Sequence, residues 1–161
     1  MVSTVARISK LLIRTVLAVF LLLIAVVGIE FLASKILGYP PILRFVMHEL
    51  PFRGQSFDPE KWSNAGSCAG LSDWKCVEKE ASCLRGPMVR DLLRVHLLIG
   101  ETTYETATAI LGVKEYDVVL QEQTCDAFSL GMCSGLGIDY DALYVCSAED
   151  GTISSTGHIQ H

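Results

Sequence analysis

The longest run of hydrophobic positions lies near the N-terminus of the chain. No charged residue interrupts the stretch from Val16 to Ile29. Extended to residues 11–33, this run would form a helix of roughly 34 Å, which is long enough to cross the hydrocarbon core of a bilayer. We therefore predict a transmembrane helix over residues 11–33. A cleaved signal peptide is the alternative, although Phe31 stands where such a cleavage site needs a small residue.

A connector over residues 34–57 follows, and prolines and glycines punctuate it. Within it, apolar positions recur at helical spacing after a proline suited to the first turn: Ile42, Phe45, Val46 and Leu50. We predict a short helix here, and the sequence allows two locations for it. The helix either lies along the outer membrane surface or packs on the folded domain.

Two helical patterns lie within residues 58–161, which we predict to be one domain. The first begins at Pro87 and stops at Gly100, because proline suits the first turn of a helix and glycine its end. The stretch before it, residues 68–83, has weak periodicity, and we expect it to be rich in loops.

The second helical pattern is shorter and ends at Gly112. Its N-terminus has two candidate caps: Thr102, which would form a capping box with Glu105, and Thr103. Its apolar stripe has helical spacing: Tyr104, Ala107, Ile110 and Leu111. The turn between the two helices is our candidate for partner contact: Gly100, Glu101, Thr102 and Thr103.

Beyond Gly112 the hydrophobic period changes from helical to two, which is typical of strands. We predict strands at residues 116–123, 141–148 and 151–160, with a hairpin turn between the last two, and a further short strand at 128–132. Two helices followed by an antiparallel meander of three or four strands define an α+β domain, with both helices on one face of the sheet.

Charge supplies an orientation for the membrane helix. The chain has 161 residues, a net charge of −5 and a mean hydropathy of +0.39, which is high for a soluble domain. Arg7, Lys10 and Arg14 precede or begin the span, whereas Lys35 is the one nearby base beyond it. The positive-inside rule places residues 1–10 in the cytoplasm and the domain outside. In a double-membrane bacterium, this is an inner-membrane protein with a periplasmic domain.

The cysteines indicate the same location. All six lie beyond the span, and an even number in a translocated region predicts disulfides: Cys68, Cys76, Cys83, Cys125, Cys133 and Cys146. Six cysteines allow fifteen pairings, and spacing alone does not select one. We favour Cys125 with Cys133 as a local pair, because the nine-residue stretch CDAFSLGMC is long enough to double back.

The helix and turn pattern resembles the SmpA/OmlA (BamE-like) group of small outer-membrane assembly lipoproteins. The residues that carry the resemblance are LLIG (97–100), TTYE (102–105), AILG (109–112) and LYVCSAEDGTISSTGHI (143–159). In that group the fold is a two-helix, three-strand sandwich similar to a repeat of β-lactamase inhibitor protein. The resemblance implies a domain that binds other proteins and performs no catalysis. Here a membrane helix stands in place of the lipidated cysteine.

Three kinds of site are disfavoured by the sequence. Nucleic-acid binding needs a basic surface, and the second helix, which would be the recognition helix, carries no Lys or Arg. Cys68 in GSCAG (66–70) resembles a nucleophile elbow, but no strand pattern precedes it. No C-x-x-C is present, which argues against zinc-ribbon and thioredoxin-like sites.

Histidines and acids give no stronger signal. His158 and His161 would point to opposite faces of a strand, and we expect His96 to be a hydrogen-bonded core histidine. Asp139 and Asp141 are interpreted as a turn and a strand entry. We predict no metal, no cofactor and no enzyme, and hence a membrane-anchored module that binds another envelope protein. The alternative is a thiol-redox or metal-binding envelope protein that uses its Cys and His residues.

Overall fold

The computed structural model describes residues 2–135 and 137–160, with side chains from Leu12 onward. The chain divides into two compact units, the first ending at Phe45 and the second beginning at Val46. Each unit is described by itself.

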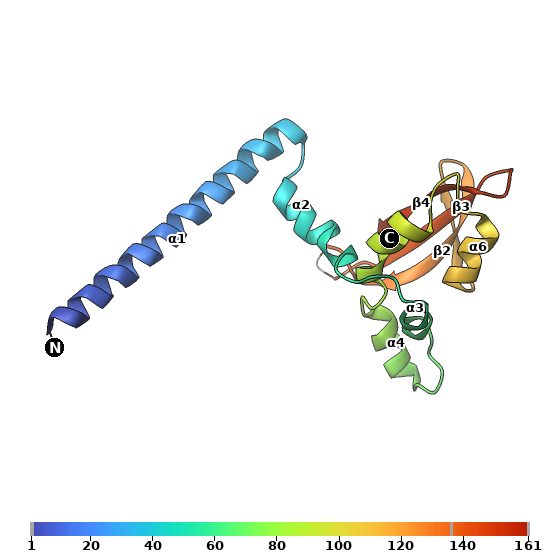
Figure 1. Ribbon diagram of the computed structural model, residues 1–161, viewed down its shortest axis with the longest axis horizontal. Coiled ribbons are helices and arrows are strands. Elements are labelled where there is room, and N and C mark those ends of the chain that lie inside the picture. The colour runs from blue at the N-terminus through green and yellow to red at the C-terminus, as the bar shows by residue number, and fades with distance from the viewer. Residues whose placement is uncertain (1, 136, 161) are drawn as a thin grey trace. The chain divides into compact units, whose positions relative to one another are not determined.

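The first unit is dominated by one uninterrupted helix, α1 (Val2–Leu37) (Figure 1). Its portion Leu12–Leu37 is long and apolar enough to cross a membrane, and it includes nearly all of the predicted span 11–33. The helix stops where Gly38 adopts a positive φ of 79° and prolines follow. Helix α2 (Pro41–His48) then begins, as its apolar spacing predicted.

Beyond α2, the described residues of the second unit form seven helical segments outside the sheet. They are η1 (Leu50–Phe52), α3 (Pro59–Ala65), α4 (Asp73–Ala81), η2 (Gly86–Met88), α5 (Val89–Asp91), η3 (Leu92–His96) and α6 (Tyr104–Leu111). The predicted helix beginning at Pro87 is therefore three consecutive turns of different type, and it ends before Gly100. Helix α6 matches the second predicted helix.

Helices α3 and α4 were not predicted. The signal for α3 is local: the Asp58 carboxylate accepts hydrogen bonds from the backbone N–H groups of Glu60 and Lys61, and Pro59 occupies the first turn. Helix α4 lies inside the stretch 68–83 that we expected to be loop-rich, so that expectation is wrong in part. Its turns are polar and bury no residue, which explains why periodicity did not reveal it.

Four antiparallel strands form one sheet in chain order: β1 (Tyr116–Leu120), β2 (Gln123–Gly131), β3 (Asp141–Ser147) and β4 (Ile153–Gln160). The α+β prediction is confirmed. Residues 116–120 of the predicted strand 116–123 form β1, and the prediction runs too far, because Gln121 and Glu122 take positive φ values of 49° and 68° and turn the chain into β2. The predicted short strand 128–132 is mostly the second half of β2.

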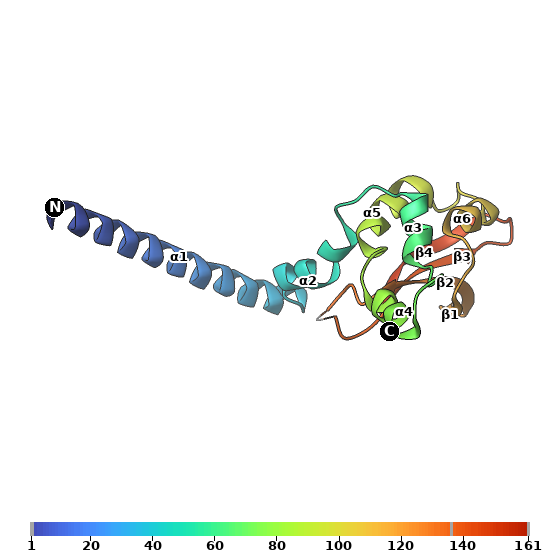
Figure 2. The same ribbon diagram turned by 90° about the horizontal axis from the view of Figure 1, so that it is seen from below.

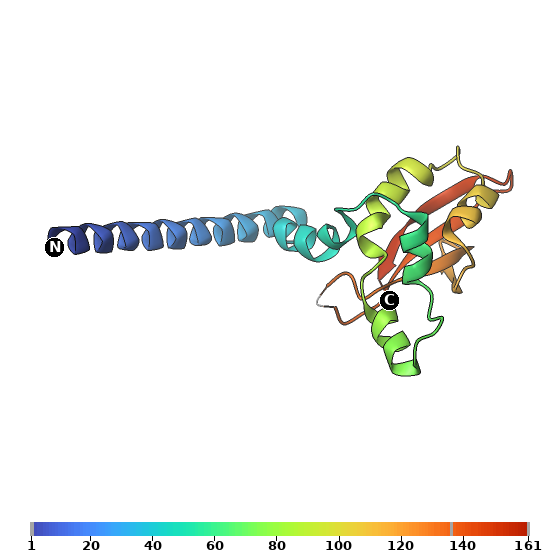
Figure 3. The ribbon, with the colours of Figure 1, turned by 60° about the horizontal axis from the view of Figure 1, so that its bottom comes forward.

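The helices α3, α5 and α6 lie over one face of the sheet (Figures 2 and 3). The main core forms there, where Phe128, Leu143 and Val145 of the sheet pack against Leu92 and Leu97. Small residues and a disulfide occupy the other face: Val118, Ala127, Ala142 and the pair Cys125–Cys146. Apolar burial on the helical face is the main stabilising contribution.

Candidate functional site

All six cysteines are paired in the structure, as Cys68–Cys76, Cys83–Cys133 and Cys125–Cys146. The favoured local pair Cys125–Cys133 is therefore wrong. Strand β2 continues from Cys125 to Gly131, at about 3.3 Å per residue, and carries the chain away from Cys125 before it reaches Cys133. Cys125 instead bonds to Cys146 of the neighbouring strand β3, with 4.3 Å between the Cα atoms.

The predicted contact turn, Gly100–Thr103, is hydrogen-bonded to Ile153, the first residue of β4. The Gly100 N–H donates to the carbonyl of Ile153, whose own N–H donates to the carbonyl of Thr102, at 2.9 and 3.0 Å. The turn therefore covers part of one sheet edge. The side chain of Glu101 is exposed, so this residue stays available for contact.

The two threonines of this turn have different roles. Thr103 is the cap of α6, because its Oγ1 accepts a hydrogen bond from the Thr106 N–H at 3.1 Å. The Oγ1 of Thr102 accepts from the Leu98 N–H and donates to the His96 carbonyl. The Thr102–Glu105 capping box is thus wrong, and the alternative cap is confirmed.

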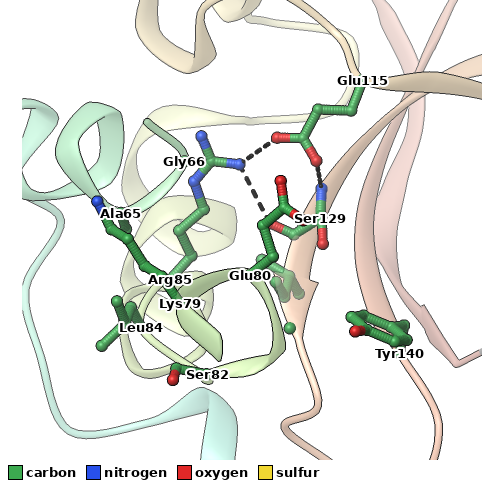
Figure 4. A pocket seen from close by; sticks show the side chains of 12 residues that line it. Ala65, Gly66, Lys79, Glu80, Ser82, Leu84, Arg85, Glu115, Ser129 and Tyr140 are labelled. Atoms are coloured by element: carbon green, nitrogen blue, oxygen red, sulfur yellow. Dashed lines mark hydrogen bonds and ion pairs between the residues drawn. The ribbon is translucent and has the colours of Figure 1, made fainter. Parts of the chain in front are cut away.

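A cavity of about 340 Å³ lies between α3, the end of α4 and β2, and the guanidinium of Arg85 forms one wall (Figure 4). Arg85 is buried. Its Nη1 donates to the Glu115 carboxylate at 2.6 Å and to the Ser129 carbonyl at 3.1 Å, while its Nε donates to the Trp62 carbonyl at 3.0 Å. The guanidinium also stacks over the Trp62 ring, with 4.7 Å to the centroid.

The buried Arg85 connects segments that are distant in the chain. Glu115 precedes β1, and its second carboxylate oxygen accepts from the Ser129 N–H at 2.8 Å, so the ion pair ties the start of β1 to β2. Gly66 leaves room for the guanidinium, because a Cβ there would lie 1.9 Å from Arg85 Nη2. We did not predict this group, since an isolated arginine in CLRGP has no distinguishing pattern.

The chemistry of this cavity is that of a structural ion pair. None of the twelve residues that line it is His or Cys, so its serines have no imidazole base beside them. The Lys79 ammonium is engaged as well, because it donates to the carbonyls of Asn64 and Ser67 at 2.5 and 2.6 Å.

A second group brings together ligands that a metal ion could use: Cys68, Cys76 and Glu80, whose ligand atoms lie within 4.8 Å of one another. Glu80 lies one turn after Cys76 on α4, which places both on the same face of the helix. However, the two sulfurs are bonded to each other. While this disulfide is closed, the group has no thiolate to offer.

The histidines lie against aromatic rings. The His96 ring lies 5.1 Å from the ring of Phe57 and is half-buried, and His158 stacks on Phe52 at 4.0 Å between centroids. Burial lowers the pKa of His158, against the raising effect of its hydrogen bond to the His48 backbone. His161 lies outside the described residues, and the pairing of His158 with it stays untested.

A charged cluster lies where α6 meets the first two strands. The Tyr104 hydroxyl donates to Asp126, and burial together with this hydrogen bond raises the pKa of Tyr104 to about 12. Lys114 donates to Asp117 at 2.6 Å and to Asp126 at 3.1 Å, and these two carboxylates raise the pKa of Lys114. In this cluster, which lies beside the start of β1, the carboxylates of Asp117 and Asp126 are paired with Lys114.

No known protein family, curated protein or solved structure matches the chain. The resemblance to the SmpA/OmlA (BamE-like) group therefore stays a prediction based on its turn and capping residues.

Proposed function

We propose that this chain is a single-pass membrane protein whose second unit lies outside the cytoplasm and acts by binding another envelope protein. The resemblance to assembly lipoproteins suggests the kind of function, namely that of a scaffold or an assembly accessory in the envelope. Anchoring raises the effective concentration of the domain near a membrane partner without any new contact.

The complete pairing of the cysteines supports the location. Disulfides form and persist in oxidising compartments and are rare in the cytosol. We expect the protein isolated from native membranes, with thiols blocked at lysis, to have no free thiol and to show six after reduction. Two reactive thiols would instead favour the thiol-redox alternative. A C-terminal reporter that faces the cytosol would show that the proposed membrane orientation is reversed.

The observation that carries the binding role is the edge strand β1. Among the described residues, the order β1-β2-β3-β4 pairs β1 with a strand on one side only, and Val119, the fourth of its five residues, is 70% exposed. The opposite edge strand, β4, has the Gly100–Thr103 turn bonded to its first residue, Ile153, and to Thr152 before it. A peptide added to β1 would extend the sheet through main-chain hydrogen bonds, with Val119 as an apolar contact.

We expect Val119→Lys to reduce recovery of the partner about tenfold when the protein is purified from gently solubilised membranes, since a lysine on an edge strand opposes strand addition. Val113→Lys is the matched control, because Val113 is 90% exposed and precedes β1 in the loop. The partner is identified by mass spectrometry after photo-crosslinking from position 119. Equal recovery with both lysine variants would contradict the proposed binding edge.

A further inference from the structure

The strongest unassigned feature of the first unit is a carboxylate inside the apolar helix. Glu30 lies seven residues before the end of α1, which corresponds to about 10 Å along the helix axis. Its Oε1 accepts hydrogen bonds from the backbone N–H groups of Ile42 and Leu43, at 2.5 and 3.2 Å. Glu30 therefore binds the N-terminus of α2, where the helix dipole favours a negative charge.

This contact fixes the depth at which α2 begins. Side chains of a helix tilt toward its N-terminus, so the carboxylate does not reach forward past the end of α1. The first turn of α2 consequently lies beside the last two turns of α1. Glu30 is half-buried, and its other carboxylate oxygen, Oε2, is enclosed and has no hydrogen-bond partner among the described residues.

The exposure and polarity of the α2 side chains are consistent with a helix that begins beside the last two turns of α1. Ile42 and Leu43 are 47% and 55% exposed, and α2 has no buried residue. By helical geometry Arg44 lies opposite the apolar arc, and its guanidinium stacks over the Tyr39 ring at 4.4 Å. An apolar face with a cationic residue opposite is the pattern of a helix that lies in the membrane interface.

We infer that α2 is seated in the outer interfacial layer of the bilayer, with Ile42 and Leu43 among the acyl chains and Arg44 at the lipid phosphates. Glu30 holds it there through the first turn of α2. The occupant of this apolar face is therefore phospholipid, because α2 follows α1 after three residues and starts at the level of its final turns. This inference rests on the proposed membrane anchor and adds a second membrane contact to it.

The test uses the full chain in phospholipid nanodiscs, with the photoreactive residue p-benzoylphenylalanine placed at one position at a time. Leu22 in α1 is the reference for the bilayer interior, and the exposed Val113 of the domain is the aqueous control. We expect Leu43 to form lipid adducts within about threefold of the yield at Leu22, and Val113 to form none. Adducts are identified by mass spectrometry of the labelled peptide.

The outcomes separate the inference from the proposed anchor. Lipid adducts at Leu22 with protein adducts or none at Leu43 would overturn the seating of α2 and leave the anchor intact. An absence of lipid adducts at both positions would overturn the anchor as well.

The holding role of Glu30 is tested with the probe kept at position 43. We expect Glu30→Ala to lower the lipid adducts at position 43 about fivefold, which is the effect of losing a helix cap. Glu30→Gln retains an oxygen acceptor and is expected to keep most of the yield. The yield at Leu22 reports whether α1 still inserts. An unchanged yield of lipid adducts at position 43 in the Glu30→Ala variant would show that Glu30 does not hold α2 at the membrane.

Discussion

Asp141→Ala is expected to lower the free energy of unfolding by about 3 kcal/mol or more, because it leaves several buried donors without an acceptor. Asp141 begins β3 and is fully buried. Its Oδ2 accepts from the N–H groups of Cys133 and Ser134 at 2.9 and 2.7 Å, and its Oδ1 accepts from the Ser134 hydroxyl at 2.6 Å. The carboxylate thus organises the loop after β2.

The measurement is urea unfolding of the full chain in detergent micelles, followed by tryptophan fluorescence, in which the buried Trp62 reports the loss of the core and Trp74 is already 76% exposed. Asp141→Asn is the matched control. Its amide oxygen can still accept from the two backbone N–H groups, and its NH₂ can donate to the Ser134 hydroxyl, so we expect a loss of about 1 kcal/mol. Equal losses in the two variants would contradict this argument, because asparagine keeps the side-chain volume and an acceptor oxygen and would then stabilise the fold no more than alanine does.

The parts of the fold that sequence reasoning found are those with local signals. Helix α6 has its cap, its apolar stripe and Gly112 within ten residues, and the hairpin before β4 turns at Gly151, which has a φ of 82°. Asp141 shows where prediction from local sequence signals stops. Its place at a strand entry was predicted, but its role was not, because its partners belong to a loop that only the folded sheet brings near.

The missed features depend on contacts between distant segments. Arg85 bonds to residues 23, 30 and 44 positions away, and no periodicity records such separations. The pairing of Cys125 with Cys146 follows from the adjacency of β2 and β3, which strand patterns alone do not specify. Helix α3 is a different case. Its Asp58–Pro59 start is a local capping signal, which hydrophobic periodicity alone does not register.

The three disulfides are expected to differ in their contributions to stability. Cys83–Cys133 spans 50 residues of chain, whereas Cys68–Cys76 spans 8. In the chain-entropy treatment, closing these loops stabilises the fold by about 4 and about 2.5 kcal/mol respectively. Packing increases the difference. A Cβ on Gly86 would lie 2.3 and 2.5 Å from the two sulfurs of Cys83–Cys133, so that bridge is in close contact with η2.

The double variant Cys83→Ala/Cys133→Ala is therefore expected to lose about 4 kcal/mol or more, and Cys68→Ala/Cys76→Ala about 2.5 kcal/mol or less. Cys133 packs against the main core, and Cys68–Cys76 joins only a loop to the polar helix α4. Each double variant keeps an even number of cysteines, so no thiol is left to mispair. The same urea titration in micelles measures both. A reversed order of the two losses would contradict the combined entropy and packing argument.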